Sequence, residues 1–117
     1  MKREQIAKIL RIHISESDKY GEKALYEAII GKCREMQIAG ATVFRGLEGY
    51  GETGELHMAH LIRHDQPIVI VVIDTAENVA RLISVAQEMM HTGLIASSSV
   101  QSIRVEKSIP GVDESGA

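Results

Sequence analysis

The sequence predicts an α+β domain of the ferredoxin-like kind, in which two helices cover one face of a four-stranded antiparallel sheet. One observation behind this fold class is that segments with strand and helix periodicity follow one another in the order βαββαβ. The other is size: the 117 residues, 44% hydrophobic and 25% charged, suit one soluble domain with a single core. We therefore expect one domain over residues 1–107 and a flexible C-terminal tail over residues 108–117.

The first half of the chain contributes a strand and a helix. Apolar and polar residues alternate over residues 8–14, as in a strand. Residues 22–37 carry apolar side chains at helical spacing, and Gly40 follows shortly after as a stop. Ser17 and Asp18 precede this helix, and we interpret them as capping residues.

A second strand and a third follow. Val43 lies between Thr42 and Phe44, a combination that favours extended backbone. After a glycine-rich, charged loop over residues 46–66, residues 67–74 form a run that is apolar on both faces. Such a run is typical of a central strand covered on both sides.

The second half ends with a helix and a last strand. Asp74 or Thr75 can cap a helix that runs to about Met90 and is closed by Gly93. Alternation over residues 100–105 then predicts the fourth strand. Because two helices cover only one face, the apolar third strand indicates that something else covers the other. Self-association in a closed cyclic oligomer is the simplest cover, and it also hides sheet edges.

Composition excludes several classes of function. The net charge of −3 gives no electrostatic basis for binding nucleic acid. Cys33 is the only cysteine, which excludes an internal disulfide, and its place in a helical pattern favours a buried thiol. The longest apolar run, residues 68–73, is too short to span a membrane, and no signal-peptide core follows the N-terminus. We therefore expect a cytoplasmic protein without membrane insertion.

An ordered set of short motifs resembles a family of uncharacterised bacterial and archaeal PII-like proteins, over about residues 10–105. The motifs are Glu16-Ser17-Asp18, Leu25-Tyr26-Glu27-Ala28, Ile38-Ala39-Gly40-Ala41-Thr42-Val43, Arg45-Gly46-Leu47-Glu48-Gly49-Tyr50-Gly51 and the strand end Ile73-Asp74. The resemblance implies a homotrimer related to the nitrogen-regulatory PII signalling proteins. Those proteins bind adenine nucleotides in clefts between subunits and contact partners through the long loop after the second strand.

The resemblance carries over to some site residues and not to others. Gly40, Thr42, Val43, Gly46 and Gly49 match the PII pattern of glycine, threonine-valine and spaced glycines that leads into the large loop. Thr92 and Gly93 match the start of the loop that wraps nucleotide phosphates in PII proteins. There the match ends. Residues 95–99 lack the second glycine, the aspartate and the phosphate-binding lysine, and the arginine-rich segment after the last strand is also missing.

The residues themselves suggest further ligand contacts. Arg45 lies beside glycines, a setting that suits recognition of a carboxylate or phosphate, and Glu48 and Glu52 could pair with Arg45 and Arg63 at the base of the loop. Hydroxyls and backbone amides of Ser97 and Ser98 could meet a small anion. The candidate ligand-binding residues are Gly40, Thr42, Arg45, Gly46, Glu48, Gly49, Thr92, Gly93, Ser97 and Ser98.

Three loop histidines offer a different chemistry. His57, His60 and His64 are spaced three and four apart, and neutral imidazoles are good ligands for zinc and similar metals. Solvated loop histidines are the alternative interpretation, because no strict pattern requires these three side chains to converge.

Three functions remain open at this point. No nucleophile with an adjacent base, no distinctive carboxylate pair and no P-loop occurs, so we do not expect an enzyme. The first hypothesis is a trimeric sensor that binds a small anionic ligand, an adenine nucleotide being one candidate, and acts through its loop on a partner such as a transporter. A ligand-independent adaptor and a metal-binding protein that uses the loop histidines are the alternatives.

Overall fold

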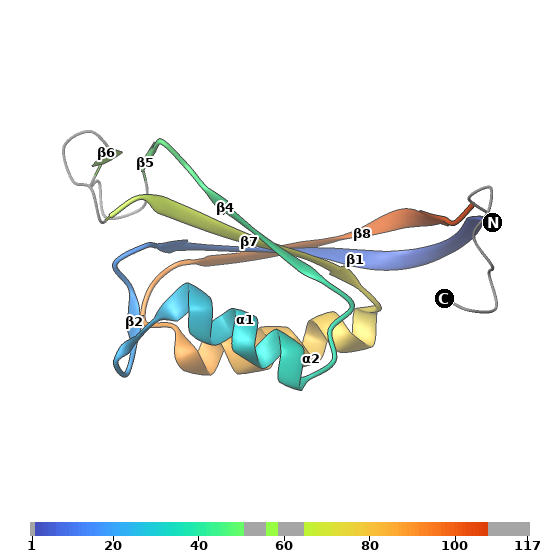
Figure 1. Ribbon diagram of the computed structural model, residues 1–117, viewed down its shortest axis with the longest axis horizontal. Coiled ribbons are helices and arrows are strands. Elements are labelled where there is room, and N and C mark those ends of the chain that lie inside the picture. Colours follow the sequence, from blue (N-terminus) through green and yellow to red (C-terminus); the bar gives the residue numbers. More distant parts are fainter. Residues whose placement is uncertain (1, 51–55, 59–64, 108–117) are drawn as a thin grey trace.

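The structure is a computed structural model that describes residues 2–50, 56–58 and 65–107 (Figure 1). The expected C-terminal tail and much of the loop over residues 46–66 lie outside the described residues. The strands are β1 (Lys2–Ser15), β2 (Lys19–Tyr20), β3 (Lys23–Ala24), β4 (Ala41–Arg45), β5 (Glu48–Tyr50), β6 (Leu56–Met58), β7 (Pro67–Asp74) and β8 (Leu94–Val105). The helices are α1 (Leu25–Glu35) and α2 (Ala76–Met89).

Four of the strands form the main sheet, in the order β4-β7-β1-β8. Every neighbouring pair is antiparallel, with β1 in register with both β7 and β8. Figure 1 shows both helices on the same side of this sheet. The predicted ferredoxin-like fold is therefore confirmed, including the two helices on one face.

The core fills the space between the sheet and the helices. Alternate residues of the two central strands point to the helices and are almost completely buried, because the side-chain period of a strand is two. The strand contribution is Leu10, Ile12, Ile14, Ile68, Ile70 and Val72. The helices contribute Leu25, Ile29 and Cys33 from α1, and Val79, Leu82, Ala86 and Met89 from α2.

No described residue of the chain forms a layer over the opposite face of the sheet. Residues of β7 on that face are half-buried or exposed, and Ile73 is 47% exposed. Phe44 of β4 and Leu94 of β8 share this face, at 56% and 58% exposure. The predicted cover of this face by a second copy therefore stays a prediction.

The central strand β1 and the edge strand β8 are longer than the sequence predicts. β1 begins at Lys2 instead of residue 8, and β8 begins at Leu94 instead of residue 100. Their continuous antiparallel register, from Lys2 opposite Val105 to His13 opposite Leu94, supplies backbone hydrogen bonds that override the low strand propensity of the polar segments. Figure 1 shows the paired ends of β1 and β8 running beyond the helices as a two-stranded ribbon.

Helix α1 is shorter than expected, and its ends differ from the prediction. Its N-cap is Ala24, which makes no side-chain capping bond, so Ser17 and Asp18 do not cap it. It ends before Gly40: Gln37 takes a left-handed φ of 59°, and the Ile38 amide donates to the Cys33 carbonyl at 2.9 Å. This is the Schellman arrangement, usually built on glycine.

Helix α2 begins as the sequence predicts, at a cap on Thr75. The Thr75 hydroxyl accepts a hydrogen bond from the Asn78 amide at 3.1 Å. The preceding residue, Asp74, is buried, and its carboxylate accepts bonds from the Ala39 amide at 2.8 Å, the Thr75 amide at 2.7 Å and the Asn78 side chain at 3.1 Å. Asp74 therefore ties the segment before β4 to the start of α2.

No described helix is both long enough and apolar enough to cross a membrane.

The backbone conformation of the connection between α2 and β8 requires a glycine, Gly93. Its φ is 137°, and an added Cβ would lie 2.6 Å from the His13 carbonyl oxygen. We expect Gly93→Ala to lower the free energy of unfolding by about 1–3 kcal/mol, measured by urea denaturation. Gly40→Ala is the matched control, because nothing lies within 4 Å of an added Cβ there. Equal stability of the Gly93 variant and the parent would contradict this account of the turn.

Acid should weaken the Asp74 contacts. Burial alone raises the pKa of Asp74, but the bonds from Ala39, Thr75 and Asn78 outweigh it and hold that pKa below its usual value. A carboxylate with a lowered folded-state pKa stabilises the protein above the unfolded pKa of about 3.9, and this contribution is lost as pH falls through the folded value.

Comparing the parent with Asp74→Asn tests how much the ionised Asp74 carboxylate contributes to stability. At pH 7 the variant should be less stable by about 1–3 kcal/mol, because an amide accepts these three bonds poorly. The gap between parent and variant should close as pH falls below about 4. A gap in urea unfolding free energy that stays constant from pH 7 to pH 3 would contradict the proposed role of the ionised carboxylate.

Candidate functional site

The end of the sheet where β1 and β4 stop gathers most of the predicted charged and loop residues. Ile68, near the start of β7, is in register with Arg45 on one side and with Ile14 on the other. His13 is in register with Leu94, the first residue of β8. One end of the sheet therefore holds the last residue of β4, the turn after β1 and the turn before β8.

Two parts of the predicted site lie at this end but on opposite edges. Arg45 and Gly46 belong to the edge formed by β4, whereas Thr92 and Gly93 lead into β8, the other edge. Because β7 and β1 lie between these strands, and strands are about 4.8 Å apart, the two edges are separated by roughly 14 Å. One phosphate or carboxylate cannot contact both edges of the same copy.

Arg45 forms an ion pair that the sequence analysis missed. Its Nη2 donates to Glu16 Oε2 at 2.6 Å, and the side chains are 48% and 20% exposed. The pair reaches across β7, from the end of β4 to the turn after β1. The predicted partner Glu48 has a side chain outside the described part of the structure, as do Glu52 and Arg63. The sequence signal for Glu16 was weak, because 29 residues separate it from Arg45.

The turn after β1 is closed by its own side chains. Asp18 accepts a hydrogen bond from the Ser15 amide at 2.9 Å through Oδ2, and its amide donates to the Ser15 carbonyl at 3.1 Å. The Ser17 hydroxyl lies 2.8 Å from Asp65 Oδ1, which joins the turn to the segment before β7. The interpretation of Ser17 and Asp18 as helix caps is therefore wrong, since these residues are used to shape the turn.

Gly46 allows the chain to leave β4 close to β7. Its amide donates to the Pro67 carbonyl at 2.7 Å, and an added Cβ would lie 2.8 Å from Pro67 Cγ. Beyond it, Glu48 and Gly49 lie in β5, paired with Met58 and His57 of β6. The described part of the predicted loop therefore contains a short two-stranded antiparallel sheet.

Four other predicted ligand residues lie away from this end. Ser97 and Ser98 are in β8, opposite Leu10 and Ile9, and not in a loop after Gly93. Since neighbouring side chains of a strand point to opposite faces, these two hydroxyls cannot face one anion. Thr42 is in β4 opposite Val71, and Gly40 precedes that strand. One copy thus brings together Arg45 and Gly46 but does not gather the whole predicted set.

The described residues support neither a histidine metal site nor a reactive cysteine. His57 lies in β6, whereas His60 and His64 are outside the described residues. Within residues 2–50, 56–58 and 65–107, no group of three side chains is arranged to hold a metal ion. Cys33 is buried, as expected, and this burial raises the pKa of its thiol against a backbone hydrogen bond that lowers it. A thiol in that state is a poor nucleophile.

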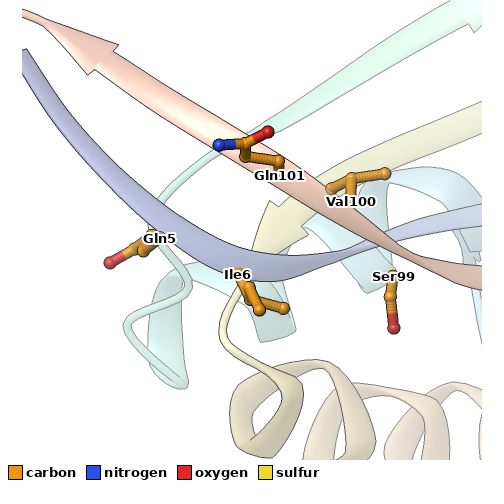
Figure 2. Close-up of a pocket in the computed structure, with 5 residues that line it drawn as sticks. All are labelled: Gln5, Ile6, Ser99, Val100 and Gln101. Carbon is orange, nitrogen blue, oxygen red and sulfur yellow. The ribbon is translucent and has the colours of Figure 1, made fainter.

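A shallow hollow lies on the ribbon of β1 and β8, away from Arg45. Figure 2 shows its lining, with Gln5 and Ile6 from β1 and Ser99, Val100 and Gln101 from β8. Its volume is about 490 Å³, and Ile6 is 84% exposed. Among the large apolar side chains of the described residues, Ile6 has the highest exposed fraction.

Comparison with known sequences places the chain in a family. The model of the family DUF190, described as an uncharacterised ACR, matches residues 7–102. A UPF0166 protein of Aquifex aeolicus is 35% identical over 98 residues, which cover 82% of this chain and 92% of the relative. A second UPF0166 protein, from Methanocaldococcus jannaschii, is 33% identical over 91 residues, covering 76% and 84%.

Comparison with solved structures identifies the fold. CPII, a nitrogen regulatory PII-like protein of Thiomonas intermedia K12, matches with a TM-score of 0.68 at 22% identity, over 86% of this chain and 91% of CPII. That structure was solved with ADP, AMP and bicarbonate bound. The resemblance to PII-like proteins inferred from the motifs is confirmed at the level of the fold. The chain therefore belongs to the DUF190 family, an uncharacterised family with members in bacteria and archaea and, here, a PII-like fold.

Proposed function

We propose that this chain is a regulatory protein that binds a small anionic ligand between copies of itself and transmits the binding to a partner protein. It performs no catalysis in this proposal. The observation that carries it is the position of Arg45 and of Gly93 at the same end but on opposite edges of one sheet. A cleft that uses both must combine the β4 edge of one copy with the β8 edge of another.

The chemistry of the two edges suits an anion. Arg45 offers a half-exposed guanidinium, which can bind a carboxylate or phosphate through two parallel bonds. Thr92 and Gly93 are exposed, so that a ligand can reach the backbone of this turn. CPII binds ADP, AMP and bicarbonate, and we take an adenine nucleotide and bicarbonate as the first ligands to test.

Self-association is the second part of the proposal. The sheet face that the helices leave open carries Phe44, Ile73 and Leu94, each about half exposed. The ribbon of β1 and β8 adds Ile6, Ile103 and Val105. Exposed apolar surface of this extent favours contact between copies. A closed trimer would bury it and would repeat the edge-to-edge cleft three times.

We assign the contact with the partner protein to the loop over residues 46–66. Its two ends are joined, because the Gly46 amide donates to the Pro67 carbonyl. The residue before the loop, Arg45, also pairs with Glu16 in the turn after β1. A ligand that binds Arg45 therefore acts directly on the residue from which the loop starts. The partner, a transporter or another regulated protein, would read that change.

The assembly can be tested at Ile6. Since this side chain is 84% exposed in the single chain, Ile6→Glu should leave the monomer's fold intact. If copies cover Ile6, the charge should weaken each contact by about 1.5–3 kcal/mol, the burial free energy of such a side chain. We expect light scattering to give a trimer for the parent and smaller species for the variant. Lys19→Glu, at an exposed position of β2, is the control, and a monomeric parent at micromolar concentration would refute the assembly.

Ligand binding can be tested at Arg45. We expect ADP, AMP or bicarbonate to raise the melting temperature of the parent, since a ligand that binds only the folded state stabilises it by mass action. Arg45→Ala should weaken that binding by about 1–3 kcal/mol in calorimetric titration, with the oligomer unchanged. Arg81→Ala, an exposed arginine of α2, is the control. No shift with any of the three ligands would favour a ligand-independent adaptor instead.

A further inference from the structure

Arg45 holds an anionic group that its own chain supplies. Glu16 Oε2 lies 2.6 Å from Arg45 Nη2, the position that a ligand oxygen would take. Nearly half of the Arg45 side chain is still exposed, so the guanidinium remains accessible from solvent. A carboxylate supplied by the chain itself therefore occupies the best anion-binding group at this end of the sheet.

Glu16 is an incompletely satisfied occupant. Its second oxygen, Oε1, is buried and accepts no hydrogen bond in the described structure. A buried acceptor without a donor has lost its hydration without gaining a hydrogen bond. The contact with Arg45 is also made by one oxygen, whereas a free carboxylate, bicarbonate or phosphate can offer two oxygens to the planar guanidinium. An external anion can therefore make the better partner for Arg45.

The backbone around Glu16 contacts the other end of the loop. The Glu16 amide donates to the Gln66 carbonyl at 2.8 Å, and the next residue, Ser17, bonds to Asp65. Glu16 thus contacts Arg45, where the chain leaves β4, and Gln66, where it enters β7. Replacing the Glu16 carboxylate on Arg45 removes one of these two links and leaves the other.

We propose that Arg45 is an anion site with Glu16 as its internal competitor, and that a carboxylate, bicarbonate or phosphate group binds by displacing Glu16. This inference rests on the proposed function, because it assigns the mode of binding at the same site. Competition lowers the apparent affinity for the anion by the fraction of copies in which Glu16 has released Arg45. Removing the competitor must raise that affinity.

The test is Glu16→Gln, which keeps the shape of the side chain and removes its charge. Calorimetric titrations with ADP, AMP and bicarbonate, done separately, distinguish a phosphate from a carboxylate-like ligand. We expect roughly three- to tenfold tighter binding than in the parent for the matching ligand, the range of a partly exposed ion pair. Glu27→Gln, an exposed acid in the first turn of α1, is the control for the same change of net charge, and should leave the affinity unchanged.

A second measurement needs no ligand. Phenylglyoxal labels accessible guanidinium groups, and peptide mass spectrometry can follow Arg45 and, as an internal reference, Arg81. We expect Glu16→Gln to accelerate the labelling of Arg45 several-fold and to leave Arg81 unchanged, because only Arg45 loses an ionic partner. Bicarbonate or phosphate should then slow the labelling of Arg45.

The outcomes separate this inference from the proposed function. Tighter binding by the Glu16 variant, including binding that appears only in that variant, supports the competition. Binding that is equal to the parent or weaker overturns it and leaves the proposed ligand site intact. If neither protein binds ADP, AMP or bicarbonate, both proposals fail. Unchanged labelling of Arg45 overturns the competition on its own.

Discussion

Two helices can cover only one face of a four-stranded sheet. This limit decides which apolar side chains of the sheet are buried and which are exposed. The inner residues of β1 and β7 are buried against α1 and α2, while Ile73, Phe44 and Leu94 are left on an open apolar face. Such a subunit gains from meeting a second copy of itself. Assembly and ligand binding are thus linked in our proposal, because the contact that covers this face also brings sheet edges together.

The register of the sheet decides which residues can cooperate. It places Arg45 and Gly93 at one end, and the strand order then separates them by the width of two strands. A site that needs a guanidinium and an open backbone turn is incomplete in one copy. In our proposal, the Glu16–Arg45 pair keeps the charged half of that site neutral until a ligand binds, so that an ion pair inside one subunit affects binding between subunits.

Periodicity predicted the fold class, because the helices and central strands bury regular apolar faces. Strand ends were predicted less well: the polar residues before Lys8 and the serines of β8 are held by pairing between distant segments. Gln37 was missed as the end of α1 because glycine usually takes that conformation. In the candidate site, Arg45 was predicted from its glycine-rich setting, and its contact with a ligand stays a prediction. Glu16 was not, since a pair 29 residues apart has no local pattern.

The central claim is that one ligand site uses residues from two copies, and mixed oligomers test it most directly. Arg45→Ala removes the cation from one edge, and Thr92→Glu places a repelling charge at the other, so each variant alone should bind ADP much more weakly than the parent. Refolding the two together pairs an intact Arg45 edge with an intact Thr92 edge at about a quarter of the sites. We expect calorimetry of the mixture to recover ADP binding at that fraction with parental affinity. No recovery in oligomers shown to contain both variants would contradict a site shared between copies.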